Sequence, residues 1–316
     1  MPAAIKTHQT IWRPAANFDT LMSKDHKRRH QAFTPTAAAT TKDGDMRKPT
    51  RAVRARILAF GCLCVVAGTV GAQSGKPSAT AGGSPRAPNV LTAADARDGW
   101  QLLFDGKTLN GWHGLGFSTT PTGLWTVEDG AIKHVEHGKG PVQPDGQPLT
   151  GMDLISDRSF ESFELAWEWK IAEAGNSGVK YNVAEALSTA MDPPHAAKGW
   201  EYQLIDDEKA EDTKIPSHRS GALYDMFAPN DRKHVNPAGQ WNRSSIIFRG
   251  NHGEHWLNGE KVVEFDLGTP RFDSVFAASK YKAYPSWFPV RRKGQIVLQD
   301  HGDVVWFRDI RIRELK

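Results

Sequence analysis

Apolar and polar residues alternate with period two through much of the C-terminal two-thirds of the chain, which is typical of β-strands with one buried face. The clearest example is the stretch GWEYQLIDD, in which Trp200, Tyr202 and Leu204 share one side of the predicted strand. Glu201 and Gln203 share the other side. Residues i and i+2 on one face of a strand lie about 6.6 Å apart. A carboxylate and an amide are therefore placed to contact one small ligand.

The same alternation recurs in many short segments. Strands are predicted at 100–104, 124–128, 131–135, 162–171, 176–183, 221–224, 240–248, 254–257, 261–266, 295–300 and 304–313. Asp129-Gly130 and Asn258-Gly259 indicate tight β-hairpins, and residues 91–99 and 271–279 favour short helices. So many short strands with one or two short helices predict an all-β, two-sheet jelly-roll sandwich of the concanavalin or lectin type. We expect its core to contain Phe163, Leu165, Trp167 and Trp169.

The N-terminal part of the chain has a different composition. Residues 46–72 are typical of a secretory signal peptide, because five basic residues precede an apolar run and Val70-Gly71-Ala72 suits cleavage before Gln73. The apolar run is too short for a stable membrane span. We therefore expect a periplasmic or secreted protein that is translated from Met46. The predicted domains are 1–45, untranslated or disordered; 46–72, the signal peptide; 73–90, a flexible tether rich in Gly, Ser, Ala and Pro; and 91–316, the folded domain.

Charge is unevenly distributed along the chain. The first 72 residues hold 12 of the 40 Lys and Arg residues but only 4 of the 36 Asp and Glu residues, so the remainder carries a net charge of about −4. A nucleic-acid-binding domain needs a basic patch, so no nucleic-acid partner is expected. Cys62 and Cys64 both lie in the leader. The exported domain is thus predicted to have no disulfide and no cysteine in its chemistry.

Other predicted strands also place two polar residues on one face. The pairs are Lys180 with Asn182, Gln299 with His301, and Glu164 with Glu168. These rows can build a binding surface, or they can simply be the solvated side of an antiparallel sheet. Glu201 between two aromatic residues is a candidate base, although an ion pair with Lys180 would explain it equally well. His301 follows Asp300 at a strand end, where an imidazole can act as acid, base or metal ligand, or can cap the turn.

Metal and cofactor chemistry has only weak signals. Asp206 and Asp207 offer oxygen ligands for a divalent cation, but a solvated pair at a strand end fits them as well. The histidines follow no zinc-type spacing. The sequence requires no cofactor and leaves a divalent metal open, and it contains no Gly-x-Ser-x-Gly elbow, phosphate loop or dinucleotide fingerprint. Three tryptophans, Trp241, Trp256 and Trp287, could stack on sugar rings.

Several motifs resemble the 3-keto-disaccharide hydrolase domain family, and together they cover residues 98–316. The motifs are WQLLFDGKTLNGW from Trp100, NSGV from Asn176, EYQLIDD from Glu201, GALY from Gly221, Trp241-Asn242, WLNG from Trp256, GQIVLQDHG from Gly294, and FRDI from Phe307. Two features depart from the family pattern. Lys180-Tyr181 stands where an aromatic residue followed by Arg is more usual, and the loop at 185–198 is long.

The resemblance implies a jelly-roll enzyme that acts on sugars whose C3 hydroxyl has been oxidised to a ketone. The ketone acidifies the C2 proton, so that a base can form an enolate that expels the C1 substituent, and water then adds. The resemblance suggests Glu201 and His301 as the base and acid, without saying which is which. The implied substrate-binding residues are Gln203, Lys180, Asn176, Asn182, Tyr224, Trp241, Gln299, Asp300 and Glu168.

Two other function classes remain compatible with the sequence. A carbohydrate-binding module would share the fold without turnover. An ordinary two-carboxylate glycosidase would need a second acid that faces Glu201, and Glu168 is the candidate for it. Incubation with a 3-keto-glycoside and with its unoxidised parent separates all three.

Overall fold

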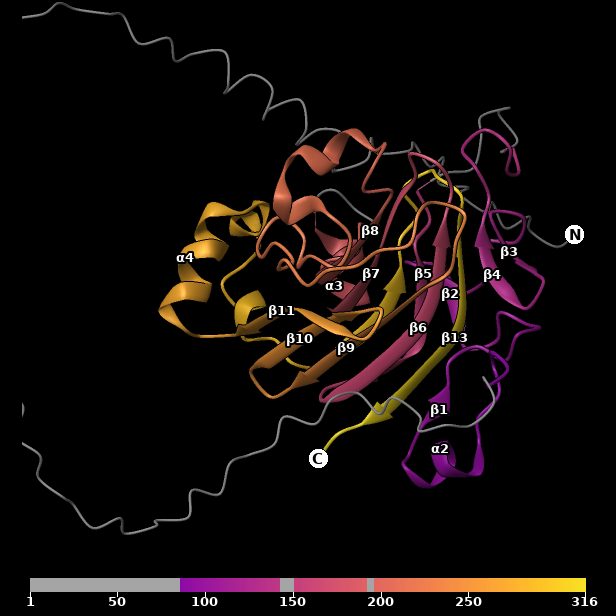
Figure 1. The fold of residues 1–316 in the computed structure, drawn as a ribbon, viewed down its shortest axis with the longest axis horizontal. Coiled ribbons are helices and arrows are strands. Elements are labelled where there is room, and N and C mark those ends of the chain that lie inside the picture. Colours follow the sequence, from indigo (N-terminus) through magenta and orange to yellow (C-terminus); the bar gives the residue numbers. More distant parts are fainter. Residues whose placement is uncertain (1–85, 143–150, 192–195) are drawn as a thin grey trace, which may run out of the picture.

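The protein is a sandwich of two antiparallel sheets (Figure 1). The structure, a computed structural model, describes residues 86–142, 151–191 and 196–316. The eight-stranded sheet has the order β11-β10-β9-β6-β13-β4-β3, with β1 beside β13, and the five-stranded sheet has the order β2-β5-β12-β7-β8. The prediction of a two-sheet jelly-roll sandwich is confirmed.

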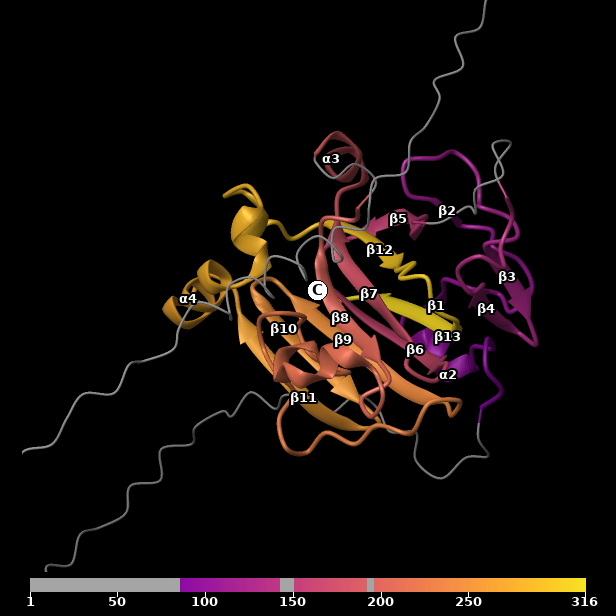
Figure 2. The ribbon, with the colours of Figure 1, turned by 90° about the horizontal axis from the view of Figure 1, so that it is seen from above.

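Most strands match the predicted segments to within a few residues. The eight-stranded sheet contains β1 (Gln101–Leu102), β3 (Trp125–Glu128), β4 (Ala131–His134), β6 (Phe163–Ile171), β9 (Asn242–Arg249), β10 (His252–Leu257), β11 (Glu260–Asp266) and β13 (Val305–Glu314). The five-stranded sheet contains β2 (Trp112–Gly114), β5 (Leu154–Phe160), β7 (Asn176–Val183), β8 (Trp200–Ile205) and β12 (Gly294–Leu298). Figure 2 shows β8, β7, β12, β5 and β2 following one another across this second sheet.

Helices are few and short. They are α2 (Ala93–Arg97), α3 (Glu185–Ala190), α4 (Pro270–Ala278) and four 3-10 turns, η1 (Glu211–Lys214), η2 (Pro216–His218), η3 (Lys280–Ala283) and η4 (Phe288–Val290). In Figure 1, α4 lies at the β11 end of the sandwich and β3 and β4 lie at the opposite end. None of the described helices is long and apolar enough to cross a membrane.

Large aromatic residues fill the space between the sheets. The rings of Trp167 on β6 and Tyr202 on β8 pack edge to face with their centres 5.0 Å apart, and the ring centres of Phe163 and Tyr181 of β7 are 6.2 Å apart. Phe163, Leu165, Trp167 and Trp169 are all at most 2% exposed, as predicted. Because strand side chains alternate between faces, the residues that flank Tyr181 and Tyr202 must point away from the core.

Both predicted hairpins are present. Asp129 and Gly130 have φ angles of 50° and 73°, and Asn258 and Gly259 have φ angles of 48° and 90°. Two successive residues with positive φ are the signature of the tight turn that Asp-Gly and Asn-Gly favour. These turns join β3 to β4 and β10 to β11.

Some elements differ from the expectations. The segment 221–224 is not a regular strand: it follows the edge of β8, where Gly221 N donates to Gln203 O at 2.9 Å and Tyr224 N donates to Glu201 O at 3.0 Å. The predicted strands also omit β2 and β5. In addition, α3 makes three α-helices among the described residues, against the one or two that were expected.

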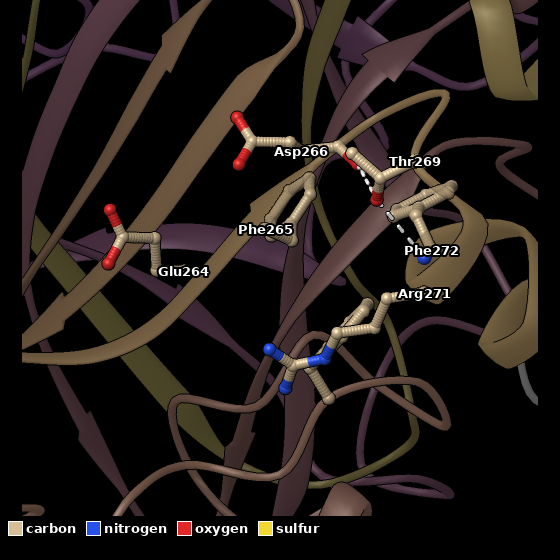
Figure 3. A pocket seen from close by; sticks show the side chains of 7 residues that line it. Glu264, Phe265, Asp266, Thr269, Arg271 and Phe272 are labelled. Carbon is tan, nitrogen blue, oxygen red and sulfur yellow. Dashed lines mark hydrogen bonds between the residues drawn. The ribbon is translucent and has the colours of Figure 1, made fainter.

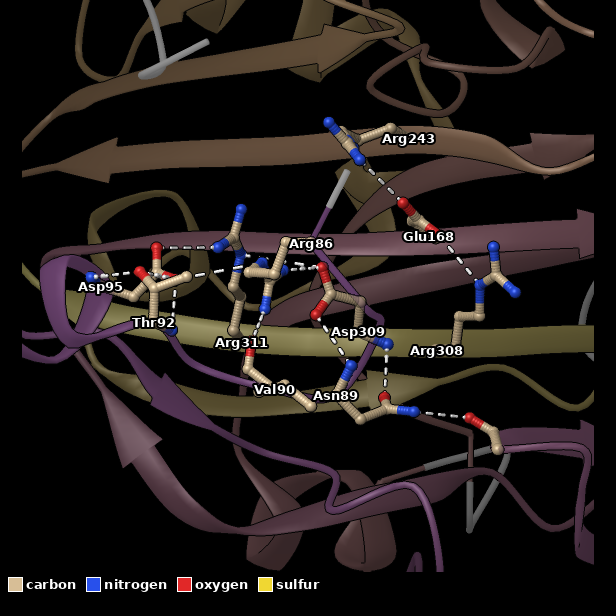
Figure 4. A network of polar contacts seen from close by, with 11 residues as sticks. Arg86, Asn89, Val90, Thr92, Asp95, Glu168, Arg243, Arg308, Asp309 and Arg311 are labelled. Atoms are coloured by element: carbon tan, nitrogen blue, oxygen red, sulfur yellow. Dashed lines mark hydrogen bonds and ion pairs between the residues drawn. The ribbon is translucent and has the colours of Figure 1, made fainter. Parts of the chain in front are cut away.

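The described chain begins inside the segment predicted to be a tether. Arg86 pairs with the Asp309 carboxylate, and Asn89 N donates to Asp309 Oδ1 at 3.1 Å (Figure 4). Ordered contacts with β13 therefore begin before residue 91. The expected signal peptide, the residues before it and most of the tether lie outside the described residues.

Candidate active site

The strand register places polar residues of several strands side by side on the outer face of the five-stranded sheet, which we call the site face. Lys180 of β7 pairs with Glu201 of β8, and Gly178 pairs with Gln203. Gln299 continues β12 beside them, since its N–H donates to Gly178 O at 2.9 Å. The site face therefore brings together Lys180, Glu201, Gln203 and Gln299, which the sequence pattern placed on three separate strands.

Glu201 is the centre of the site face. It is only 3% exposed, and its Oε2 lies 3.8 Å from Lys180 Nζ and 3.8 Å from Lys280 Nζ. Gly178 leaves room for the carboxylate, because a Cβ at this position would lie only 2.8 Å from Glu201 Oε1 and 3.1 Å from Gln299 Oε1. A buried carboxylate is stable only when it is paired with charge or hydrogen-bond donors. Here two ammonium groups flank it.

A second carboxyl group, that of Asp153, belongs to the same cluster. Its Oδ1 accepts a hydrogen bond from Asp300 N at 2.9 Å. Burial raises the pKa of Asp153 to about 6; the charge of Lys180 opposes this rise, and the charges of Asp300 and Glu201 add to it. Perturbed carboxyl groups of this kind are common in active sites, because they can exchange protons near neutral pH.

Two buried amides supply acceptors to the site face. Gln203 Nε2 donates to Asn176 Oδ1 at 2.8 Å. Within the described part of the chain, the Oε1 atoms of Gln203 and Gln299 have no hydrogen-bond partner although they are buried. Leaving a buried acceptor unsatisfied costs about 1–3 kcal/mol. The hydroxyl groups of a bound ligand would supply the missing donors.

Tyr224 and Lys280 meet at the edge of this cluster. Lys280 Nζ lies 4.0 Å from the centre of the Tyr224 ring. Tyr224 Oη donates to Asp212 Oδ2 at 3.0 Å, and Lys280 N donates to Asp225 Oδ2 at 2.6 Å. The segment after β8 and the η3 turn after α4 thus contribute side chains to one place.

His301 lies at the margin of the site face, in the turn after β12. Burial alone would raise the pKa of Asp212, but its hydrogen bonds to His218 and Tyr224 and the nearby charge of His301 hold that pKa below its usual value. His301 is partly exposed. It is therefore close to the Tyr224–Asp212 pair and partly open to solvent, with which an imidazole can exchange protons.

His218 binds two carboxylates at once. Its Nδ1 lies 2.8 Å from Asp212 Oδ1 and its Nε2 lies 3.1 Å from Asp225 Oδ1. We call these three residues the clamp. Burial opposes the imidazolium, but the hydrogen bonds to Asp212 and Asp225 prevail and raise the pKa of His218 to about 9.

The raised pKa of His218 predicts a pH-dependent stability. The folded protein holds the His218 proton up to about pH 9, whereas an unfolded histidine releases it near pH 6.5. The contribution is therefore fully present below pH 6.5 and is lost as the pH rises through 9. We expect the free energy of unfolding to fall by about 3 kcal/mol over this interval. Urea titrations at several pH values would measure it, and His218→Gln should remove most of the slope.

Two predicted site residues lie on the other side of the sandwich. Glu168 is on the outer face of β6, where its carboxylate accepts from Arg243 at 2.9 Å and from Arg308 at 2.9 Å (Figure 4). Trp241 packs on the same face, with the Arg308 guanidinium 3.8 Å from its ring centre. Neither faces Glu201. The two-carboxylate glycosidase that pairs Glu201 with Glu168 is therefore not formed.

Two further predicted residues are engaged in structural contacts. The Asp300 carboxylate accepts from Met152 N at 3.0 Å and Gly302 N at 2.9 Å, and it pairs with buried His134 at 3.0 Å. Asn182 is fully buried and donates to Arg292 O at 2.5 Å. The Asp300 carboxylate thus has little capacity left for a ligand, whereas Asn182 Oδ1 is buried without a hydrogen-bond partner among the described residues.

Among the described residues, one group of side chains is spaced as metal ligands would be. His252, Glu254 and Glu264 have ligand atoms within 4.8 Å of one another. However, the ammonium of Lys261 already binds Glu254 at 3.1 Å and Glu264 at 2.9 Å. Asp206 and Asp207, the candidate cation ligands, instead accept backbone hydrogen bonds from Ala174 and Ser220.

A hollow of about 430 Å³ lies between β11 and α4 (Figure 3). Its described lining is Phe227, Glu264, Phe265, Asp266, Thr269, Arg271 and Phe272. None of these residues belongs to the site face. Catalysis by proton transfer needs a positioned acid and base, and the site face, with its buried carboxyl groups and cations, meets that need better than this hollow.

Sequence reasoning did not find Asp153, Lys280 or the clamp. Asp153 immediately precedes β5, whose burial pattern is three buried, three exposed and one buried residue rather than an alternation. Lys280 lies in a 3-10 turn and reaches the site only through tertiary packing. The clamp joins residues six and seven positions apart around irregular turns. A single sequence carries no periodic signal for any of them.

Known proteins resemble this chain in sequence and in structure. The model of the 3-keto-alpha-glucoside-1,2-lyase-like domain matches residues 99–313. A protein named 3-keto-disaccharide hydrolase from Bacteroides thetaiotaomicron is 37% identical over 235 residues, which are 69% of this chain and 79% of the relative.

Two solved structures of candidate glycosyl hydrolases from Parabacteroides distasonis are also similar. The first is 32% identical with a TM-score of 0.62, over 73% of this chain and 100% of the other. The second is 28% identical with a TM-score of 0.50, over 68% and 99% of the two chains. The chain therefore belongs to the 3-keto-alpha-glucoside-1,2-lyase-like domain family and is a carbohydrate hydrolase of that family.

Proposed function

We propose that the protein cleaves glycosides whose C3 hydroxyl has been oxidised to a ketone, through an anionic enolate. The observation that carries this proposal is the position of two ammonium groups, Lys180 and Lys280, each 3.8 Å from Glu201 Oε2. An ordinary glycosidase passes through a cationic, oxocarbenium-like transition state, which two nearby cations would destabilise. The same cations stabilise a developing enolate.

The proposed reaction begins with loss of the C2 proton to Glu201. The electron pair of the C2–H bond forms the C2–C3 double bond of the enolate, and the negative charge moves to the C3 oxygen. The enolate then collapses back to the ketone, a C1–C2 double bond forms and the C1–O bond breaks. The leaving oxygen takes a proton from His301. Water then adds at C1, a proton returns to C2, and the net change is hydrolysis.

Each residue of the site face has a role in this scheme. Glu201 is the base, and Lys180 and Lys280 stabilise the enolate oxygen. Asp153, whose charge already acts on Lys180, keeps that ammonium paired when Glu201 takes up the proton. Gln203 and Gln299 accept hydrogen bonds from sugar hydroxyls through their unpartnered Oε1 atoms. His301, at the solvent-exposed margin, supplies and recovers the proton of the leaving group.

The names of the relatives suit a two-stage reaction. The matching family is described as a 1,2-lyase-like domain and the Bacteroides relative as a hydrolase. Elimination across C1 and C2 alone is a lyase step, and elimination followed by hydration is hydrolysis. One site that forms and then hydrates the enone accounts for both names.

The proposal includes export. The signal-peptide pattern of residues 46–72 supports a mature chain that starts near Gln73 in the periplasm or outside the cell. N-terminal sequencing of protein from cell fractions tests this directly, and an uncleaved chain in the cytoplasmic fraction would contradict it.

Release of the aglycone from a 3-keto-glucoside and from its unoxidised parent tests the reaction. We expect turnover of the keto sugar and none of the parent, because the C2 proton of the parent is not acidic. A keto sugar deuterated at C2 should react more slowly if proton removal limits the rate. Rapid hydrolysis of the parent would overturn the enolate route, and no release from either sugar would overturn catalysis on glucosides.

A further inference from the structure

The two side chains at the edge of the site face come from separate parts of the chain. Tyr224 follows β8, and its N–H donates to Glu201 O at 3.0 Å. Lys280 belongs to η3, and its Nζ lies 3.8 Å from Glu201 Oε2. Neither segment contains a regular strand of the five-stranded sheet. The backbone hydrogen bond to β8 holds the main chain of Tyr224, but further contacts must place the Tyr224 ring and the η3 turn beside Glu201.

The clamp makes this connection. Asp212 accepts from the Tyr224 hydroxyl at 3.0 Å through Oδ2 and contacts His218 at 2.8 Å through Oδ1. Asp225 accepts from Lys280 N at 2.6 Å through Oδ2 and contacts His218 at 3.1 Å through Oδ1. Each aspartate therefore gives one oxygen to His218 and the other to a residue of the site.

The imidazole also contacts Tyr224 directly. The two rings stack with their centres 4.3 Å apart and an angle of 26° between them. Lys280 Nζ also lies over the Tyr224 ring, 4.0 Å from its centre. Tyr224 is therefore located by two cations and by Asp212, and the position of Lys280 relative to Glu201 depends on the same unit.

Only the protonated imidazole can hold both aspartates. Carboxylates are acceptors, and a neutral imidazole has a single N–H to donate. Asp225 itself has a φ of 57°, an unfavourable conformation for a residue with a Cβ. The contacts to His218 and to Lys280 N stabilise it in that conformation.

We propose that His218 is a positioning residue, which holds Lys280 and Tyr224 against Glu201 through Asp212 and Asp225. The loss of kcat that follows from this inference rests on the proposed function of the site face. The displacement of Lys280 does not rest on it. Glutamine has the size to replace the imidazole and lacks its positive charge. In His218→Gln, Lys280 should therefore move away from Glu201 while the sheet stays folded.

The reactivity of Lys280 tests the structural part without any substrate. Acetylation with a limiting amount of acetic anhydride, followed by peptide mass spectrometry, measures each lysine separately. In His218→Gln we expect Lys280 to react at least about threefold faster, because its ammonium leaves the Tyr224 ring. Lys133, on the outer face of the eight-stranded sheet, should be unchanged. Equal acceleration of both lysines would indicate general loosening and would overturn the inference, as would no change at Lys280.

Turnover of a 3-keto-glucoside tests the kinetic part. Removal of one preorganised group that stabilises an oxyanion lowers kcat by about 10²–10³-fold, and displacement of Lys280 should cost about tenfold with little change in KM. In a Lys280→Ala background, His218→Gln should lower kcat further by less than about threefold, because the ammonium group that His218 positions is already absent. Full additivity of the two substitutions would overturn the positioning role.

A matched control exists on the other side of the sandwich. His252 also binds carboxylates, with its Nδ1 2.8 Å from Asp266 and its Nε2 3.3 Å from Glu254. His252→Gln should leave kcat unchanged, and an equal loss of kcat in both variants would overturn the inference. If His218→Gln folds poorly, Asp225→Asn should give the same change at Lys280. A wild-type protein that turns over no keto sugar would refute the proposed function, while the acetylation result would still decide the clamp.

Discussion

Replacing Glu201 by Gln should lower turnover of a 3-keto-glycoside by about two to four orders of magnitude, the range expected for loss of a general base. The amide keeps the shape of the side chain over Gly178 but cannot take up the C2 proton. The His301→Ala variant should lose activity by a similar factor, because the leaving oxygen would lack its proton donor. Initial rates of aglycone release under substrate saturation measure both effects.

Glu168→Gln is the matched control for this experiment. Glu168 is also a glutamate held by two cations, but it lies on the outer face of the eight-stranded sheet. Its substitution should leave turnover unchanged within about twofold, since it has no access to the same sugar. Loss of activity in Glu168→Gln with retained activity in Glu201→Gln would place the reaction on the outer face of the eight-stranded sheet. The site face would then not be the active site.

On the strands that alternate regularly, the side of the sheet to which each side chain points could be predicted from sequence, because it depends only on local alternation. The register of aromatic and polar residues along β8 is enough to point Glu201 and Gln203 away from the core. The same holds for Lys180 on β7, whose neighbour Tyr181 is fully buried. Where the alternation is regular, burial of the aromatic side chains leaves one orientation for the rest.

Alternation does not show which of the two sheets a strand joins. Glu168 follows the same rule as Glu201 and also points outward, but β6 lies in the eight-stranded sheet and β8 in the five-stranded one. A sandwich has two outer faces, and strand pairing over long sequence distances decides between them. Trp241, which the family resemblance implied as a sugar-binding residue, likewise lies with Arg308 on the other face.

Irregular segments carry the rest of the site, and a periodic pattern cannot describe them. Regular β12 ends at Leu298, so the period of two that placed Gln299 and His301 on one face stops before His301. Asp300 instead turns toward Met152 and His134. Lys280 is brought to Glu201 by the packing of α4 and η3. Tertiary contacts of this kind need a structure to be seen.

The second large effect concerns the core that supports the site face. Trp167→Ala should lower the free energy of unfolding by about 3–5 kcal/mol, the usual cost of removing a buried Trp or Phe side chain. Trp167 is 2% exposed and its ring contacts Tyr202, the neighbour of Glu201, at 5.0 Å. The cavity would open directly beneath β8. Thermal unfolding should show a Tm lower by about 10 °C.

Trp241→Ala provides the comparison for this prediction. Its ring is half-buried on the outer face and contacts Arg308 and Lys170 at 3.8 and 5.1 Å. Exposed cation–π contacts contribute about 0.5–1 kcal/mol each, so the loss of stability should be much smaller than for Trp167→Ala. Turnover should be unchanged, because Trp241 and Glu201 lie on opposite faces of the sandwich. A near-neutral Trp167→Ala would show that this side chain is not in the core, and the outward orientation of Glu201 would then lose its support.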